Sequence, residues 1–306
     1  MTDGMSLGAV RRVSILFRLG GFGVVATCAA AYGCSGDAFT LAPADAAAPS
    51  NSSGTGAPDG SGAPTDGGAD APSDGAAASF CSAYTLYTLC ESFDVDGAPG
   101  QLTPVTGGTA AAGTIATDST TFFSAPNSME ATTPAVTTLG ASARALAGKT
   151  FASPGTQLYL QAEFQVIKSC LTTDGVTIEL VTMSLAAGAE YSVALTLAST
   201  GSYVTEILTA ADGGVSTDVH DDTSVLTAGD WSNVKLTIHL DKKTFDLMFG
   251  ATGVSAVPLT EEPVTAAAAT AAAFAVGASV TYTTVQSTGC TVYVDNVVFN
   301  DTVMLP

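Results

Sequence analysis

The feature that most constrains the fold is an alternation of apolar and polar residues beyond residue 150. In residues 158–166 and 234–241 every second side chain is apolar, which is the period of a half-buried β-strand. No amphipathic helix separates the strand-like segments, so we expect antiparallel strands rather than parallel βαβ units. Only the alanine-rich residues 266–273 are expected to form a short helix or a loop. Further strands are predicted at residues 175–185, 191–198, 203–209, 244–249, 272–280 and 290–300.

The N-terminal segment has the pattern of a secretory leader. Three arginines within the first 18 residues precede an uncharged apolar run, residues 19–32, that is too short to span a bilayer. The run ends at Gly33-Cys34, which resembles the lipobox of bacterial lipoproteins, where a small residue precedes a cysteine that becomes acylated. We therefore predict a signal peptide over residues 1–33 and a lipid on Cys34. Lipidation at Cys28 and cleavage without a lipid are the alternatives.

The segment after Cys34 is expected to be a disordered tether over residues 34–79. It consists almost wholly of Ala, Gly, Ser, Pro, Thr and Asp, and it cannot bury enough apolar surface to offset the entropy of ordering. Aromatic and β-branched residues become frequent from Phe80, so residues 80–306 form the predicted folded domain. These features predict an exported protein on the outer membrane or cell surface, held in the membrane through its lipid anchor.

The charge balance excludes one class of partner. The chain has 9 basic and 28 acidic residues, a net charge of −19. After removal of residues 1–33, six basic residues face twenty-seven acidic ones, a net charge of −21. Such a surface repels polyanions, so no nucleic acid is expected as a partner.

Four short segments carry a resemblance to a known fold family. Residues 91–94 (Glu-Ser-Phe-Asp), 124–131, 228–236 (with Gly229 and Trp231) and 293–299 resemble strands of the concanavalin A-like lectin/glucanase family, in its laminin-G-like form. The resemblance implies an all-β domain, an antiparallel β-sandwich of the jelly-roll type, over about residues 80–300. It also implies a polysaccharide or a cell-surface glycan as the partner. We expect Trp231 to pack in the core.

The cysteines predict disulfides. With Cys28 in the leader and Cys34 acylated, an even number of cysteines remains in an exported chain, which is typical of paired disulfides. Three connectivities are open, and we predict the one with a short and a long loop. It joins Cys81 to Cys90 and Cys170 to Cys290.

Catalysis is not expected from the motifs. The glucanases of the family carry paired carboxylates in an E-x-D-x-E or E-x-D-x-x-E strand pattern, which this sequence lacks. The alginate-lyase relatives need Arg, Gln, His and Tyr on one face, and the domain offers a single arginine, Arg144, while His239 has no partner motif. We therefore expect a non-catalytic carbohydrate-binding module. The alternatives are a structural or adhesive surface protein without a ligand pocket, and a polysaccharide-degrading enzyme.

A structural calcium site is the one cofactor expectation. Calcium prefers several hard oxygen ligands, and Glu91, Asp94 and Asp96 lie near one end of the domain sequence. The resemblance implies that the first and last strands pair, which would bring these groups toward Asp295, at a position where related sugar-binding modules have a calcium ligand. A zinc site is not expected, because no C-x-x-C spacing exists and the chain has two histidines.

Overall fold

The computed structural model describes residues 80–95, 97–152, 154–222, 227–259 and 269–301. The predicted signal peptide, the lipidation of Cys34, the tether over residues 34–79 and the side chain of Asp96 lie outside these residues. Within the described ranges, no helix combines the length and the hydrophobicity needed to cross a membrane.

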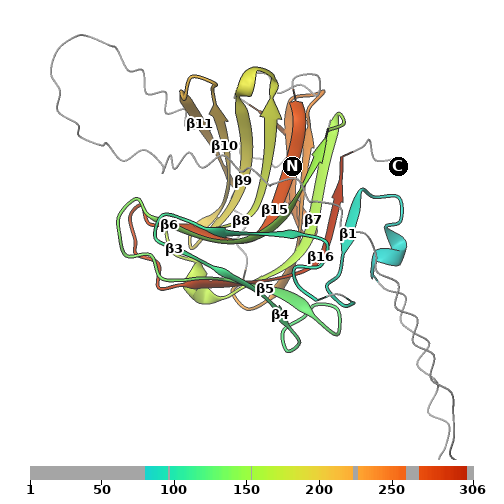
Figure 1. Cartoon of the computed structure of the whole chain (residues 1–306), viewed down its shortest axis with the longest axis vertical. Coiled ribbons are helices and arrows are strands. Elements are labelled where there is room, and N and C mark those ends of the chain that lie inside the picture. The colour runs from blue at the N-terminus through green and yellow to red at the C-terminus, as the bar shows by residue number, and fades with distance from the viewer. Residues whose placement is uncertain (1–79, 96, 153, 223–226, 260–268, 302–306) are drawn as a thin grey trace, which may run out of the picture.

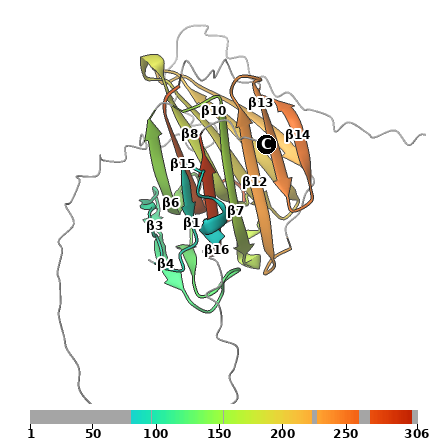
Figure 2. The same ribbon diagram turned by 90° about the vertical axis from the view of Figure 1, so that its right-hand side faces the viewer.

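The domain consists of two β-sheets packed face to face (Figures 1 and 2). The first sheet has the strand order β14-β13-β12-β7-β16-β5-β4, with β1 paired to β16. Its strands are β1 (Leu89–Glu91), β4 (Thr114–Asp118), β5 (Ser128–Thr133), β7 (Gln157–Val166), β12 (Trp231–His239), β13 (Thr244–Phe249), β14 (Thr252–Pro258) and β16 (Cys290–Asn300). The first and last strands of the described domain therefore pair, as the resemblance implied.

The second sheet has the order β11-β10-β9-β8-β15-β6-β2, with β3 parallel to β6 and every other named pairing antiparallel. Its strands are β2 (Thr103–Gly107), β3 (Ala111–Ala112), β6 (Ser142–Ala152), β8 (Val176–Leu185), β9 (Glu190–Ala198), β10 (Gly201–Thr209), β11 (Val215–Asp222) and β15 (Ala269–Thr281). The 3₁₀ turns are η1 (Phe80–Ala83), η2 (Lys168–Cys170) and η3 (Ala186–Gly188). The predicted antiparallel sandwich is thus confirmed.

Alternation along the strands builds the core between the sheets. In β7, Leu158 and Leu160 point inward and are buried, as are Leu236 and Ile238 on the neighbouring β12. Full burial of such side chains stabilises the fold by about 1.5–3 kcal/mol each. The intervening residues face outward. The alternation therefore decides which side chains can form a functional face.

The expectation of a helix or loop at residues 266–273 is wrong from Ala269 onward, where β15 begins. Residues 260–268 are outside the described part of the chain. The alanines suit a central strand, because β15 is hydrogen-bonded to both β6 and β8 and its side chains are buried on both faces. Across from Ala275 lies Gly148, where a Cβ would collide with the carbonyl oxygen of Phe274. Tertiary packing here overrides helix propensity.

The predicted disulfide connectivity is confirmed. Cys81 and Cys90 are joined with a Cα–Cα distance of 5.5 Å. Cys170 and Cys290 are joined at 4.8 Å across a sequence separation of 120 residues. The second bridge fastens the first residue of β16 to the turn η2 that follows β7.

Candidate functional site

A row of side chains crosses the outer face of the first sheet. Tyr293 on β16 is the register partner of Gln165 on β7, and Gln165 is the partner of Trp231 on β12. Directly paired residues share a face of a sheet, and the neighbouring Phe164 points into the core. Trp231 is therefore half-buried on the outer face. The expectation that Trp231 packs in the core is wrong. Trp231 lies three residues before the inward-pointing Val234, an odd number, so its side chain points to the opposite face of the strand.

The segment between β4 and β5 carries two exposed aromatic rings, and that of Phe123 lies on this face. Phe122 is 36% exposed and Phe123 is 53% exposed. The ring of Phe123 lies 6.0 Å from that of Trp231, measured between centroids, in an edge-on arrangement. Exposed aromatic groups that cluster on one face mark a binding surface more often than isolated apolar residues do. We refer to Phe123, Trp231 and Tyr293 as the aromatic row.

A buried carboxylate holds this segment against the sheet. The carboxylate of Asp295 accepts hydrogen bonds from the backbone N–H groups of Phe123 at 3.0 Å and Ser124 at 2.8 Å. It also accepts one from the backbone N–H of Asn296 at 2.8 Å. Desolvation raises the pKa of Asp295 to about 6, although these hydrogen bonds favour the charged form. The position of Phe123 therefore depends on a side chain from the last strand.

Beside Asp295 lies a second polar group. Glu163 on β7 is the register partner of both Asp295 and Asn233. Its carboxylate accepts a hydrogen bond of 2.6 Å from the side-chain amide of Asn233. Desolvation raises the pKa of Glu163, while the Asn233 hydrogen bond and the charge of Lys235 oppose that rise. The aromatic row is thus bordered by groups that can accept and donate hydrogen bonds.

The structure brings together part of the predicted calcium set. Asp94 lies close enough to Asp295 for its charge to raise the Asp295 pKa, and the backbone N–H of Asn127 donates to the Asp94 carboxylate at 3.4 Å. The Glu91 carboxylate is instead held by the backbone N–H groups of Phe93, at 2.9 Å, and Gln101, at 2.7 Å. The hard oxygens around Asp295 suit calcium chemically. In the described ranges, however, Glu91, Asp94 and Asp295 do not form a group with metal-ligand spacing. The calcium site stays a prediction.

Among the described residues, the outer face of the second sheet lacks an aromatic row of the kind described above for the first sheet and carries mostly small side chains. Its central positions carry small residues, such as Thr182 opposite Ala273 and Thr196 opposite Thr177. Arg144 lies on this face opposite Ser279.

His239, the other residue considered for the alginate-lyase pattern, lies on the first sheet. It faces outward with its Nε2 3.0 Å from Asp246 Oδ2. Arg144 and His239 therefore lie on different sheets.

Sequence reasoning missed most of the aromatic row. It did not select Phe123 or Tyr293, and it assigned Trp231 to the core. The outward direction of Trp231 follows from the alternation in residues 231–239, since Val234, Leu236 and Ile238 point inward. No local signal shows that Phe123 meets Trp231, because the two residues are far apart in the sequence.

Comparison with known proteins identifies the fold of the domain but no family. No protein-family model matches the chain, and no curated protein matches it. Among solved structures, the chain is similar to the endo-β-1,4-glucuronan lyase of the fungus Trichoderma reesei. The two share 14% sequence identity with a TM-score of 0.54, over 70% of this chain and 95% of the lyase.

Two other solved structures are more distant. The cellulose-induced protein Cip1 shares 16% identity with a TM-score of 0.43, over 71% of this chain and all (100%) of Cip1. A GH16 protein of Bacteroides ovatus, in complex with a glucan product, shares 11% identity with a TM-score of 0.39, over 60% of this chain and 84% of that one.

The comparison corrects one expectation. We expected no enzyme, because the glucanase and lyase patterns are missing from the sequence. The similar structure with the TM-score of 0.54 is a polysaccharide lyase, so the fold is one that supports catalysis, and the missing patterns do not justify that expectation. Fold alone does not fix the activity. The domain is a jelly-roll β-sandwich of the concanavalin A-like fold.

Proposed function

We propose that this chain is an exported, lipid-anchored surface protein whose β-sandwich binds a polysaccharide across the outer face of the first sheet. The observation that carries the proposal is the contact of the exposed Phe123 ring with Trp231, in line with Tyr293. Aromatic rings offer the flat apolar surface on which sugar rings pack, and polar groups at their border fix the orientation of a ligand. Gln165, Glu163 and the nearby carboxylates supply that border.

The charge around the aromatic row supports a neutral ligand. Glu130 is the register partner of Tyr293, and Glu163 and Asp295 lie in the adjacent row. The outer face of β12 contributes one cation, Lys235, next to these acids. An anionic uronate chain would meet like charges here. We therefore propose a neutral polysaccharide, in contrast to the glucuronan named for the similar lyase.

The proposed location rests on the sequence of the leader. A lipid on Cys34, followed by a spacer without a hydrophobic core, would hold the domain away from the membrane surface and leave the aromatic row free to reach a glycan. Replacement of Cys34 by Ser tests the anchor. We expect wild-type protein to fractionate with membranes and to partition into detergent, and the Cys34→Ser protein to do neither. A Cys34→Ser protein that still fractionates with membranes would contradict lipidation at this residue.

Binding to insoluble polysaccharides tests the proposed function. Wild-type protein is mixed with cellulose, xylan and a β-1,3-glucan as neutral chains, and with insoluble calcium alginate as an anionic one. We expect retention on at least one neutral chain and loss of that retention in the Phe123→Ala/Trp231→Ala variant. Leu139→Ala removes an exposed apolar side chain elsewhere and serves as the matched control.

Two outcomes would change the proposal. Retention of the double variant at the wild-type level would remove the aromatic row from the binding site, and binding to alginate alone would contradict the neutral ligand. The same mixtures are assayed for soluble sugars. Release of sugars by wild type, and not by the double variant, would show that the same face also cleaves the chain.

A further inference from the structure

The inner face of the second sheet carries a second cluster of side chains, at its β11 edge. In the antiparallel pair β10–β11, Glu206 is the register partner of Asp218, and Val204 is the partner of His220. Val204 belongs to the hydrophobic core. The alternation therefore turns Glu206, Asp218 and His220 toward the space between the two sheets, where the ring of His220 contacts Phe245 of the first sheet at 5.2 Å between centroids.

We propose that Glu206, Asp218 and His220 bind a divalent zinc ion, although the spacing of cysteines and histidines in the sequence predicted no zinc site. One ligand atom from each residue lies within 4.8 Å of the other two, and no second group of this kind is found among the described residues. His220 Nε2 contacts Glu206 Oε1 directly and lies 3.8 Å from Asp218 Oδ2. Zinc–nitrogen and zinc–oxygen bonds of about 2.0–2.2 Å require ligand atoms roughly 3–4 Å apart. Small side-chain adjustments would bring the three atoms to that spacing.

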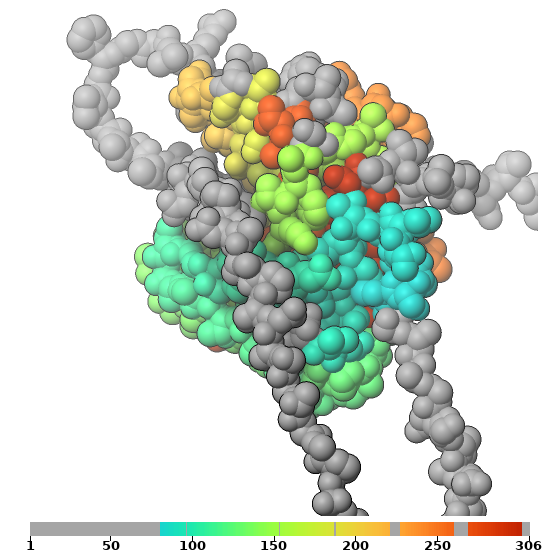
Figure 3. Space-filling view, turned by 45° about the vertical axis from the view of Figure 1, so that its right-hand side comes forward, coloured from blue at the N-terminus to red at the C-terminus, as the bar shows by residue number. Residues whose placement is uncertain are grey.

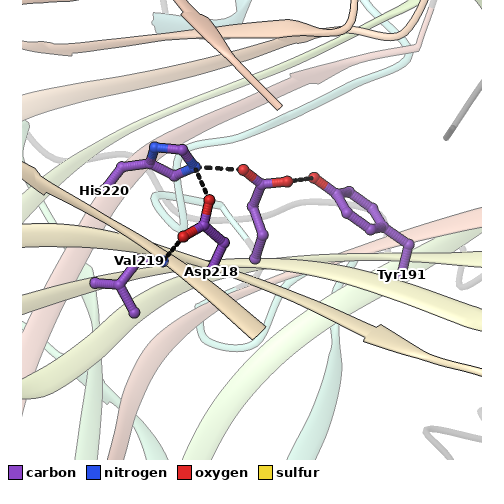
Figure 4. Close-up of polar contacts among 5 residues, drawn as sticks. Tyr191, Asp218, Val219 and His220 are labelled. Carbon is purple, nitrogen blue, oxygen red and sulfur yellow. Dashed lines mark hydrogen bonds and ion pairs between the residues drawn. The ribbon is translucent and has the colours of Figure 1, made fainter. Parts of the chain in front are cut away.

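The second oxygen of each carboxylate, the one not assigned to the zinc ion, accepts a hydrogen bond from another group. Tyr191 donates its hydroxyl hydrogen to Glu206 Oε2 at 2.7 Å, and the backbone N–H of Val219 donates to Asp218 Oδ1 at 3.0 Å. Figure 4 shows the His220 ring nitrogen directed at the carboxylates of Asp218 and Glu206, with the Tyr191 hydroxyl on the far oxygen of Glu206. Outer partners of this kind fix metal ligands in metalloproteins and strengthen binding. The cluster therefore has oriented ligand atoms with supporting contacts.

Burial and charge favour a cation at this place. The Glu206 side chain is fully buried, whereas His220 is 11% exposed and Asp218 is 21% exposed. Two carboxylates this close in a nearly dry setting repel one another, and a divalent ion would offset that cost. The exposure on the side of Asp218 gives the ion a route from solvent and leaves room for a water as the fourth ligand.

The donor set favours zinc over calcium. An imidazole nitrogen suits zinc and is a poor ligand for calcium, which prefers oxygen. The proposed zinc site also lies on the opposite sheet from Asp295, where calcium is predicted. The two ions can therefore be tested separately in the same protein.

The test uses the full chain, purified without a histidine tag, stripped with chelator, and dialysed against zinc in the presence of excess calcium. We expect one bound zinc per chain by elemental analysis. His220→Ala and Asp218→Asn should each weaken zinc binding at least ten-fold, and Tyr191→Phe about ten-fold, because it removes only an outer contact. His239→Ala is the matched control, since His239 also pairs with a carboxylate, on Asp246.

Cobalt substitution gives a second measurement. Co²⁺ bound in place of zinc should show visible absorption with the nitrogen and oxygen ligand set, and Asp218→Asn should change that spectrum. The Asp218 side chain is partly exposed, so this variant remains informative if His220→Ala fails to fold. Absence of stoichiometric zinc in the folded wild type, or equal zinc binding by His220→Ala and His239→Ala, would overturn the proposal.

Discussion

The outer faces of the two sheets differ in chemistry although both follow the same two-residue alternation. The face of the first sheet carries the aromatic row and the polar groups around Asp295, and a chain segment crosses it. The face of the second sheet carries mostly small residues over β8, β9 and β15. A binding site for an extended ligand needs flat apolar surface with polar groups at its edge. This difference is the reason why we propose the outer face of the first sheet, and not that of the second, as the binding face.

The buried carboxylates of the two sheets differ in a related way. On the first sheet the buried carboxylate of Asp295 is held by three backbone N–H groups. On the second sheet the carboxylate of Glu179 is fully buried, and in the described part of the chain neither of its oxygens has a hydrogen-bond partner. Its register partners, Leu195 and Val276, belong to the core. One carboxylate organises a surface, whereas the other carries a cost that protonation reduces.

The largest expected effect concerns the strand that carries Tyr293 and Asp295. Replacing Cys170 and Cys290 by Ala opens a loop of 120 residues, and the loop-entropy model predicts a loss of about 4–5 kcal/mol in the free energy of unfolding. Denaturant unfolding measures it. The matched variant without Cys81–Cys90 should lose less, about 3 kcal/mol, and equal losses would show that the long bridge has no special role in fixing β16.

The next effect concerns Glu179. Burial raises its pKa from 4.5 to about 8, so the native state holds a proton that the unfolded chain releases. The protonated Glu179 contributes its full share of stability below the pKa that Glu179 has in the unfolded chain. This contribution is lost as the pH rises through the pKa of Glu179 in the folded protein. We expect the free energy of unfolding to fall by on the order of 3 kcal/mol across this window.

The Glu179→Gln variant provides the control for that titration. It keeps the size of the side chain and removes its ionisation, so its stability should vary less with pH over the same window. Denaturant unfolding at a series of pH values compares the two proteins. Parallel curves for wild type and Glu179→Gln would show that Glu179 titrates normally.

Calcium provides a third test, directed at the first sheet. If calcium binds at Asp94 and Asp295, an ion concentration a hundred times its Kd stabilises the fold by about 2.7 kcal/mol. Thermal unfolding with calcium and with chelator measures this, and the gain should vanish in Asp94→Asn. Equal midpoints for wild type under both conditions would dispose of the calcium site.

The smallest expected effect on stability is that of Asp295→Asn in calcium-free buffer. The variant removes charge-assisted hydrogen bonds to the Phe123 and Ser124 amides, which should cost about 2 kcal/mol. Glu130→Gln changes a partly exposed carboxylate in the adjacent row, and its stability should stay within about 0.5 kcal/mol of wild type. Unfolding by denaturant compares the two, and equal stabilities would mean that Asp295 does not anchor the segment.

Much of the sandwich could be predicted from the sequence. Strands with clear alternation were predicted to within one residue at β7 and β16 and to within three residues at β12. The sequence patterns did not predict β2, β3, β4, β6, β11 or β14. Strand β11, for example, has a polar sequence, Val215–Asp222, lies at the sheet edge and lacks a regular apolar pattern. The alanines of β15 were misread because local propensity favours a helix, whereas burial between two strands favours small side chains.

The functional groups were harder to predict than the strands. The cluster of Glu206, Asp218 and His220 depends on the register of two strands, one of which was not predicted. The aromatic row depends on a contact between segments more than one hundred residues apart in sequence. Alternation gives the face on which a residue lies, but the pairing of strands decides which residues meet there.

The most direct test of the binding face uses the fluorescence of Trp231, which is the one tryptophan of the chain. A soluble oligosaccharide of the polysaccharide that retains the protein is titrated into the full chain. We predict a saturable change in emission, at least ten-fold weaker affinity in Phe123→Ala, and no change in affinity in Tyr203→Ala, which alters the outer face of the second sheet. Saturable binding by calorimetry without any change in Trp231 emission, or loss of binding in Tyr203→Ala alone, would contradict the account.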